Sequence, residues 1–167
     1  MKKVVIVFIL ILISIVFFMS YSSSSSPEEI LNDVLSELLV FDFEEMKELE
    51  GDQVSEHQKQ SMKKLKNHFT DRAFEKLSLN LSNFTSIYTF YQLRCSTEVV
   101  TIEYDTRELD TSTVVYYTVH LKLLYEDTNK EDEVIQLEGT TNIIKEDKCY
   151  KIKSIQLNTR SIKNRRN

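Results

Sequence analysis

The side chains best suited to metal, acid–base or thiol chemistry are few in this sequence and lie far apart. The chain holds three histidines and two cysteines. His57 and His68 are eleven residues apart on one expected helix, so they do not meet at one metal ion, and the cysteines fall in separate expected strands. We therefore expect no metal site and no bound cofactor.

Catalytic motifs are equally scarce. The whole chain has two glycines and no glycine-rich phosphate loop, and no Ser-His-Asp pattern occurs. One acid–base set can be assembled, because Tyr116 and His120 share a face of one expected strand and Asp105 lies at the end of its neighbour. A histidine on the wetter face of a strand is usually a surface residue, so we expect the protein not to be an enzyme.

The first residues indicate a membrane segment. Lys2 and Lys3 precede the uncharged run VVIVFILILISIVFFM. At about 1.5 Å per residue, a helix over residues 4–21 is about 27 Å long, close to the ~30 Å hydrocarbon layer. No Ala-x-Ala site follows, which favours an uncleaved anchor (residues 1–21) over a removed signal peptide, with secretion after cleavage as the alternative. The two lysines favour a cytoplasmic N-terminus and a domain outside the cytoplasm.

In such a compartment, Cys95 and Cys149 have two interpretations. A disulfide between them would close a loop of about 54 residues and contribute about 4 kcal/mol in the chain-entropy model. Two separate buried thiols are the alternative. The spacing alone leaves both open.

The stretch after the membrane segment indicates a spacer and then a helix. Serines 22–26 form a short flexible spacer. Ser26, Pro27 and Glu29 have the pattern of a helix N-terminus, and shorter helices are expected after Asp42, from Gln53 to Phe69, and after Thr70. Apolar residues recur in the first helix at spacings of three and four, which predicts one buried stripe. They are Ile30, Leu31, Val34, Leu35, Leu38, Leu39 and Phe41.

From about Ser86 onward the apolar period falls from near 3.6 residues to two, which indicates strands. In the stretch 112–125, residues of one parity are much more apolar than those of the other, so one face is expected to pack on the core. A change of apolar parity in the last strand predicts a bulge near Ser154, and the isolated Gly139 suggests a bend. The four expected strands are 91–107, 112–125, 134–145 and 149–157.

Charge is distributed unevenly along the chain. All 26 acidic residues, but only 15 of the 21 basic ones, lie between Pro27 and Leu157. This strongly negative domain is unsuited to binding nucleic acid. Residues 158–167 have the opposite sign and are expected to form a basic flexible tail, with contact to an anionic surface as the alternative. The cations of that tail are Arg160, Lys163, Arg165 and Arg166.

Helices followed by a meander of about four antiparallel strands predict an α+β domain over residues 27–157. The segments PEEILNDVLSELL, FDFEEMKEL, HFTDRAFEKL and KCYKIKSIQL, together with three long strands, resemble the nuclear transport factor 2-like superfamily, with its cystatin-like α+β cone, in the membrane-anchored bacterial form. The resemblance implies helices packed on a curved sheet. Some members are isomerases or cyclases with a catalytic cavity inside the cone, and many membrane-anchored members are non-catalytic parts of conjugation or type IV secretion machines.

We therefore predict a non-catalytic, single-pass protein of a bacterial cell envelope whose extracytoplasmic domain binds a protein partner or another copy of itself. The resemblance implies a place as an accessory subunit of a conjugation or type IV secretion-type complex. The alternative is a small-ligand carrier, or an isomerase- or cyclase-like enzyme, that uses the cone cavity. The residues considered for a groove or cavity lining are Tyr88, Phe90, Tyr91, Tyr116 and His120, although the aromatic ones more often fill a core.

Overall fold

The computed structural model describes residues 25–49, 51–79 and 87–163. Within these ranges, no helix is both long and apolar enough to cross a membrane. The expected membrane segment at residues 1–21 and most of the serine spacer lie outside them. The described part has the predicted α+β class, with helices that precede a four-stranded antiparallel sheet.

Helix α2 (Pro27–Leu39) begins where the sequence predicts. Ser26 Oγ accepts a hydrogen bond from the Glu29 amide at 3.1 Å, and the Ser26 amide donates to Glu29 Oε2 at 2.9 Å. This reciprocal capping satisfies two amides at the helix start. The predicted apolar stripe faces the core, where six side chains of α2 are at most 6% exposed.

Four further helices and one 3-10 helix are described between α2 and the sheet, and all but the last of them follow the predicted order. Asp42 Oδ1 accepts from the Glu44 amide at 2.9 Å and starts the first of them, and Thr70 Oγ1 accepts from the Ala73 amide at 3.3 Å in the first turn of another. The elements are α3 (Phe43–Met46), α4 (Gly51–Lys64), η1 (Leu65–His68), α5 (Asp71–Leu79) and α7 (Ile87–Leu93).

Helix α7 corrects the sequence prediction. The apolar pattern predicts a strand from residue 91, but residues 87–93 are helical and strand β1 (Cys95–Leu109) begins after them. Tyrosine and phenylalanine favour strands, yet this preference depends strongly on context. Here packing decides, because Phe90 is fully buried with its ring 6.5 Å from that of Phe41. Arg94, at φ 51°, then ends the helix in a left-handed conformation and turns the chain into β1.

The strands are paired in the order in which the chain makes them. β1 pairs with β2 (Ser112–Tyr125), β2 with β3 (Glu133–Glu146), and β3 with β4 (Cys149–Leu157), all antiparallel. β2 and β4 have the predicted bounds. Asp147 and Lys148 both have positive φ, which is the conformation that a two-residue turn between β3 and β4 requires.

Two bulges interrupt the regular pairing. In β4, Ile152 pairs with Ile143 and Ser154 with Asn142, which leaves Lys153 as an extra residue beside the predicted position. In β1, the register shifts at Val100. Bulges bend a strand and increase its twist, so both edge strands of this sheet are bent.

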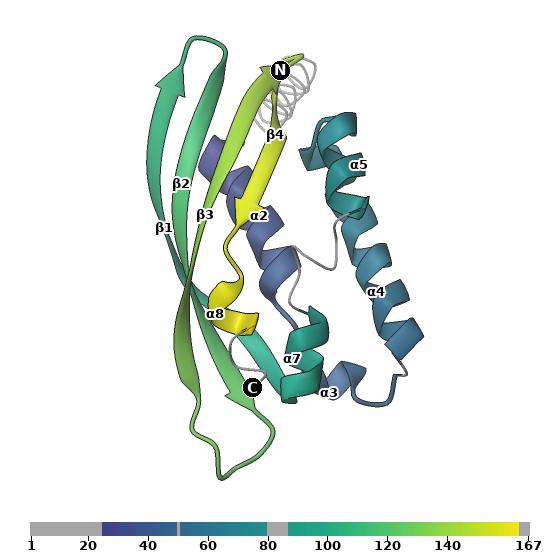
Figure 1. Ribbon diagram of the computed structural model, residues 1–167. Coiled ribbons are helices and arrows are strands. Elements are labelled where there is room, and N and C mark those ends of the chain that lie inside the picture. Colours follow the sequence, from purple (N-terminus) through teal and green to yellow (C-terminus); the bar gives the residue numbers. More distant parts are fainter. Residues whose placement is uncertain (1–24, 50, 80–86, 164–167) are drawn as a thin grey trace, which may run out of the picture.

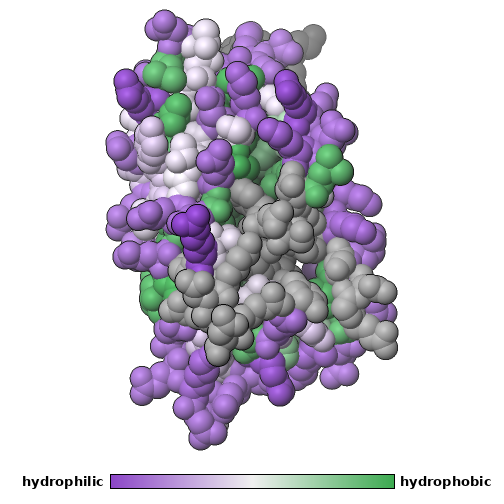
Figure 2. Space-filling view, in the orientation of Figure 1, coloured by the Kyte–Doolittle hydropathy of each residue, from purple (hydrophilic) through white to green (hydrophobic). Residues whose placement is uncertain are grey.

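The described helices lie on one face of the sheet, and no described element covers the other face (Figure 1). The core fills the space between α2 and β2. The inward side chains of β2 are at most 3% exposed. Seen from the side drawn in Figure 2, hydrophilic residues cover most of the surface that the described residues form, and hydrophobic ones form small separate groups. The inward residues of β2 are Val115, Tyr117, Val119, Leu121 and Leu123.

The end of the chain also differs from the prediction. The sequence predicts a flexible tail from residue 158, but the Asn158 amide donates to Glu138 O at 2.8 Å and helix α8 (Arg160–Lys163) follows. Ile162 of this helix is fully buried. Burial of one such side chain is worth about 2 kcal/mol, which favours a one-turn helix docked on the core. Residues 164–167 lie outside the described ranges.

Candidate functional site

The uncovered face of the sheet carries the side chains that alternate with the core residues. Because Val115, Tyr117 and Val119 point to the helices, Tyr116 and His120 point away from them. Directly paired residues of an antiparallel sheet share a face, so the partners of Tyr116 on β1 and β3 point the same way. This face is open to solvent, and Tyr116 is 48% exposed.

A groove of about 590 Å³ crosses this face. We call it the sheet groove. Its described lining comes from all four strands and from Asn158 just after β4, and not from a helix. The lining residues whose side chains point to the open face are Glu103, Asp105, Tyr116, Thr118, Glu138, Thr140 and Gln156.

The sheet groove is acidic. Glu103, Asp105 and Glu138 line it, and its described lining includes no lysine, arginine or histidine. His120 stands just beyond the groove, with its Nε2 atom 3.3 Å from Glu103 Oε1. The groove combines these carboxylates with hydroxyl and amide side chains and is open to water, so it is suited to hold a cationic or hydrogen-bonding ligand.

Two tyrosines beneath the groove are held neutral. Burial raises the pKa of the Tyr117 hydroxyl well above its ordinary value, and burial together with the charge of Glu28 raises the pKa of Tyr104. Tyr117 Oη donates to Gln156 O at 2.7 Å. Both phenols therefore stay protonated at neutral pH and supply no base for chemistry.

The acid–base set considered from the sequence does not converge. Asp105 is paired directly with Tyr116, but His120 lies four residues further along β2. At the usual rise of about 3.3 Å per residue, this separates His120 from Tyr116 by about 13 Å. General acid–base catalysis needs hydrogen-bond reach of about 3 Å between the groups and the substrate. These three residues are therefore spread over an open surface.

The aromatic residues considered for a cavity lining divide between core and surface. Phe90 is fully buried in the core. Tyr91 is half-buried, with its ring 5.9 Å from that of Phe43 and its hydroxyl donating to Leu49 O at 2.9 Å. The side chain of Tyr88 lies outside the part that the structure describes. Tyr116 lines the sheet groove, and His120 stands next to it.

The disulfide considered between Cys95 and Cys149 is not present in the structure, which has two separate thiols instead. Both are free, with Cys95 buried and Cys149 exposed. Cys95 begins β1 opposite the end of β2, whereas Cys149 begins β4 opposite the end of β3. Strand β3 runs from one of these ends of the sheet to the other, which is about 45 Å for its 14 residues. A disulfide needs Cα atoms within about 7 Å.

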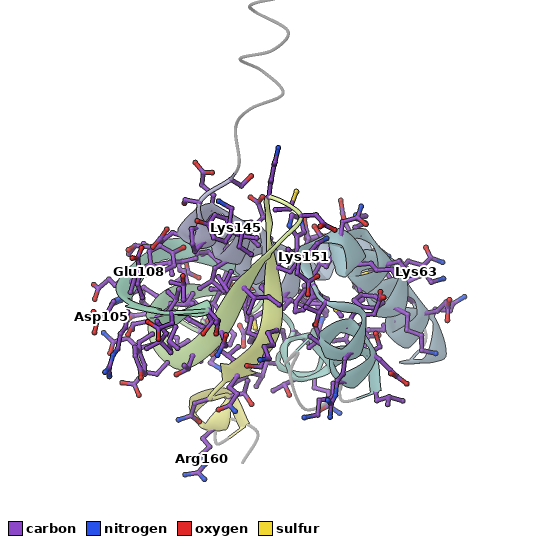
Figure 3. All side chains as sticks on the ribbon, turned by 90° about the horizontal axis from the view of Figure 1, so that it is seen from above. Lys63, Asp105, Glu108, Lys145, Lys151 and Arg160 are labelled. Atoms are coloured by element: carbon purple, nitrogen blue, oxygen red, sulfur yellow. The ribbon has the colours of Figure 1, made fainter. Side chains whose placement is uncertain are left out.

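The basic residues near the C-terminus are only partly described. Arg160 is exposed on α8, at one side of the molecule (Figure 3). The side chain of Lys163 and residues 165 and 166 lie beyond the described part of the chain. Contact between these cations and an anionic surface therefore stays a prediction.

A second open cleft has the opposite charge. It holds about 570 Å³ between α5 and the strands β3 and β4. Arg72, Lys76 and Lys153 line it, with Glu146 as the acidic residue of its described lining.

No group of three or more histidine, cysteine, aspartate or glutamate side chains is placed to hold a metal ion in the described residues.

Sequence reasoning named Asp105 and Tyr116 but not Glu103 and Glu138. These two glutamates come together because Thr118 of β2 pairs with Glu103 on one side and with Glu138 on the other. The available signal was an acidic residue at an outward position in each of two strands. The register that aligns them depends on contacts between residues distant in sequence.

The chain matches no protein-family model, no curated protein and no solved structure with which it was compared. Its function is therefore inferred from the geometry of the site.

Proposed function

We propose that the chain is a non-catalytic binding module of a bacterial cell envelope, anchored by residues 4–21, whose extracytoplasmic domain contacts a protein partner through the open face of its sheet. We assign the domain to the nuclear transport factor 2-like cones on the segments named above. A place as an accessory subunit of a conjugation or type IV secretion-type complex belongs to this proposal.

One observation carries the binding role. Side chains fill the space between α2 and β2, and the cleft between α5 and the strands β3 and β4 is open, whereas the sheet groove lies on the outer face of the sheet. An enclosed cavity of a few hundred Å³ is the usual site of a small ligand. An open face with both polar and apolar groups is better suited to bind the surface of another protein.

The alternative function is a carrier or an isomerase- or cyclase-like enzyme that uses the interior of the cone. It requires titratable side chains that point inward among apolar ones. His120 and Tyr116 point outward, and Phe90 occupies the interior. These positions favour the binding module over the cavity enzyme.

Site-specific cross-linking in the native membrane tests the proposal. A photoreactive phenylalanine analogue replaces Tyr116 in the full chain, and irradiation is expected to join the chain covalently to a partner protein. The same analogue in place of Lys63, which projects from α4 on the helical side of the molecule (Figure 3), is the control. Adducts at position 63 that equal those at position 116, or no adduct at 116, would contradict the proposal.

A further inference from the structure

Strand β1 has one edge with which no other described strand pairs. It is the first strand of the sheet and pairs only with β2. On its other side, the described residues supply one backbone partner, Phe41, whose carbonyl oxygen accepts from the Thr97 amide at 2.7 Å. From Glu98 to Leu109 no described backbone group pairs with this edge, and in Figure 1 no described element lies beyond β1. An edge of this length presents a row of free amides and carbonyls.

The opposite edge of the sheet is covered. Phe69 bridges Ile152 of β4, the Thr70 amide donates to Ile152 O at 3.0 Å, and Lys151 Nζ donates to Asn67 O. The segment between η1 and α5 thus occupies the β4 edge at its middle. Strand addition to this sheet is therefore available at β1 and obstructed at β4.

The free edge is acidic. Between Glu98 and Leu109, β1 carries four carboxylates and one guanidinium, that of Arg107. Asp105 and Glu108 project outward on the side of the molecule opposite Lys63 (Figure 3). Glu103 and Asp105 also line the sheet groove, where Glu138 of β3 adds a further carboxylate. The acidic edge and the acidic groove are one continuous surface.

This charge selects the kind of strand that can pair there. A second copy of β1, paired antiparallel, would bring its own carboxylates against those of the first, and like charges directly opposite each other are destabilising. A strand rich in lysine or arginine would instead place cations beside Glu103 and Asp105 on β1. An added strand gains affinity from main-chain hydrogen bonds and specificity from its alternate side chains.

We propose that the β1 edge binds an extended, lysine- or arginine-rich segment of the partner protein as a fifth strand, with alternate cationic side chains beside Glu103 and Asp105 at the β1 rim of the sheet groove. This inference rests on the proposed function, because it names where and how the partner's chain is held. It excludes self-pairing through β1.

Binding of a defined peptide to the full chain in lipid nanodiscs tests the inference. The probe is a fluorescent peptide of about nine residues, a usual strand length, with lysine at every second position between threonine and valine. Fluorescence anisotropy is expected to show binding that weakens as salt is added, and hydrogen exchange is expected to slow in the amides of residues 98–109. The same peptide with glutamate in place of lysine is expected not to bind.

Two controls separate strand addition from simple charge attraction. A lysine peptide N-methylated at alternate residues keeps its charge but loses amide donors along one edge. Full retention of its affinity would overturn strand addition. The double variant Glu103→Lys and Asp105→Lys is expected to weaken binding by on the order of tenfold. The variant Glu45→Lys and Glu75→Lys has the same net charge, with both changes on exposed helix positions, and is expected to bind as the unaltered chain does.

The two proposals fail in different ways. If a partner is cross-linked at position 116 but Glu103→Lys with Asp105→Lys leaves that adduct unchanged, strand addition is wrong and the binding role stands. If no partner is cross-linked at 116, the proposed function itself is wrong.

Discussion

At Gly139 the packing of the sheet leaves no space for a side chain. The ring of Tyr117 on the neighbouring strand lies over it, and a Cβ atom at this position would be 2.2 Å from Tyr117 Cζ and 2.4 Å from Gln156 O. One of these contacts is with backbone, so it cannot be relieved by a rotamer change. The isolated glycine in the sequence, taken there as a sign of a bend, provides space for an aromatic ring.

Gly139→Ala is therefore expected to destabilise the protein by about 1–3 kcal/mol, the usual cost of overpacking. The added methyl group would also displace Tyr117 Oη from Gln156 O. Urea unfolding of the full chain in detergent, followed by tyrosine fluorescence, measures the change. Thr140→Ala, at the next residue but on the open face, is the matched control and is expected to cost much less. Equal losses for the two variants would contradict this account.

Two buried groups predict how stability depends on alkaline pH. Burial raises the pKa of the Cys95 thiol from 9.0 to about 11. Burial also raises the pKa of the Tyr117 hydroxyl well above its ordinary value. Since the folded-state pKa values exceed the unfolded ones, their contribution to stability is complete below about pH 9 and is lost as the pH rises toward the folded-state values. The unfolding free energy is expected to fall between about pH 9 and 11.

Variants separate these groups from other alkaline effects. Cys95→Ala is expected to reduce the pH-dependent loss of unfolding free energy, whereas Cys149→Ser, at an exposed thiol, is expected to leave it unchanged. The measurement is a set of urea titrations at pH values from 7 to 11. An identical pH profile in Cys95→Ala and the unaltered chain would show that the Cys95 thiol does not contribute.

At the scale of elements, α2 is the helix whose position was most accurately predicted from local sequence. Its start depends on residues next to one another, Ser26, Pro27 and Glu29, and its apolar stripe follows from a spacing of three and four. Thr106 Oγ1 donates to Glu28 Oε1 at 2.8 Å and connects this end of the helix to β1. The helix end therefore also fixes the position of the sheet's free edge strand.

Ser26→Ala is expected to destabilise the protein by about 1 kcal/mol, because the Glu29 amide loses the serine oxygen that accepts its hydrogen bond. The same urea titration measures this change. Ser25→Ala, one residue earlier and exposed, is the control and is expected to lie within about 0.5 kcal/mol of the unaltered chain. A larger loss for Ser25→Ala than for Ser26→Ala would contradict the capping assignment.

Helix α7 and the groove carboxylates mark the limits of local sequence patterns. Phe90 and its neighbours have strand-forming residue types, but burial of Phe90 against Phe41 compensates for a weaker helix preference. Likewise, Glu103 and Glu138 are unremarkable in sequence and become neighbours of Thr118 only through strand register.

For the molecule as a whole, the two cysteines provide a test of the proposed extracytoplasmic location of the domain. Cys149 is exposed, whereas Cys95 is fully buried and its raised pKa keeps it protonated. A thiolate is the reactive form. In intact cells pretreated with a mild reductant, a membrane-impermeant maleimide is expected to label Cys149 and not Cys95.

Cys149→Ser is the matched control for this labelling and is expected to abolish it. Lysed cells provide the positive control for the unaltered chain. Labelling that appears only after lysis would place the domain in the cytoplasm and contradict the proposed location, while leaving the β1 edge inference open to its own peptide test.

The sequence by itself determined the α+β class, the order of the helices from α2 to α5 and of the four strands, the bounds of β2 and β4, and the bulge beside Ser154. These features depend on patterns within a few residues: caps, turns and apolar periods. The tertiary structure alone decided that Phe90 sits in a helix, that Cys95 and Cys149 lie at opposite ends of the sheet, and that three carboxylates meet in one groove. Each of these depends on contacts between residues distant in the chain, which become defined only when the strands align and the core closes.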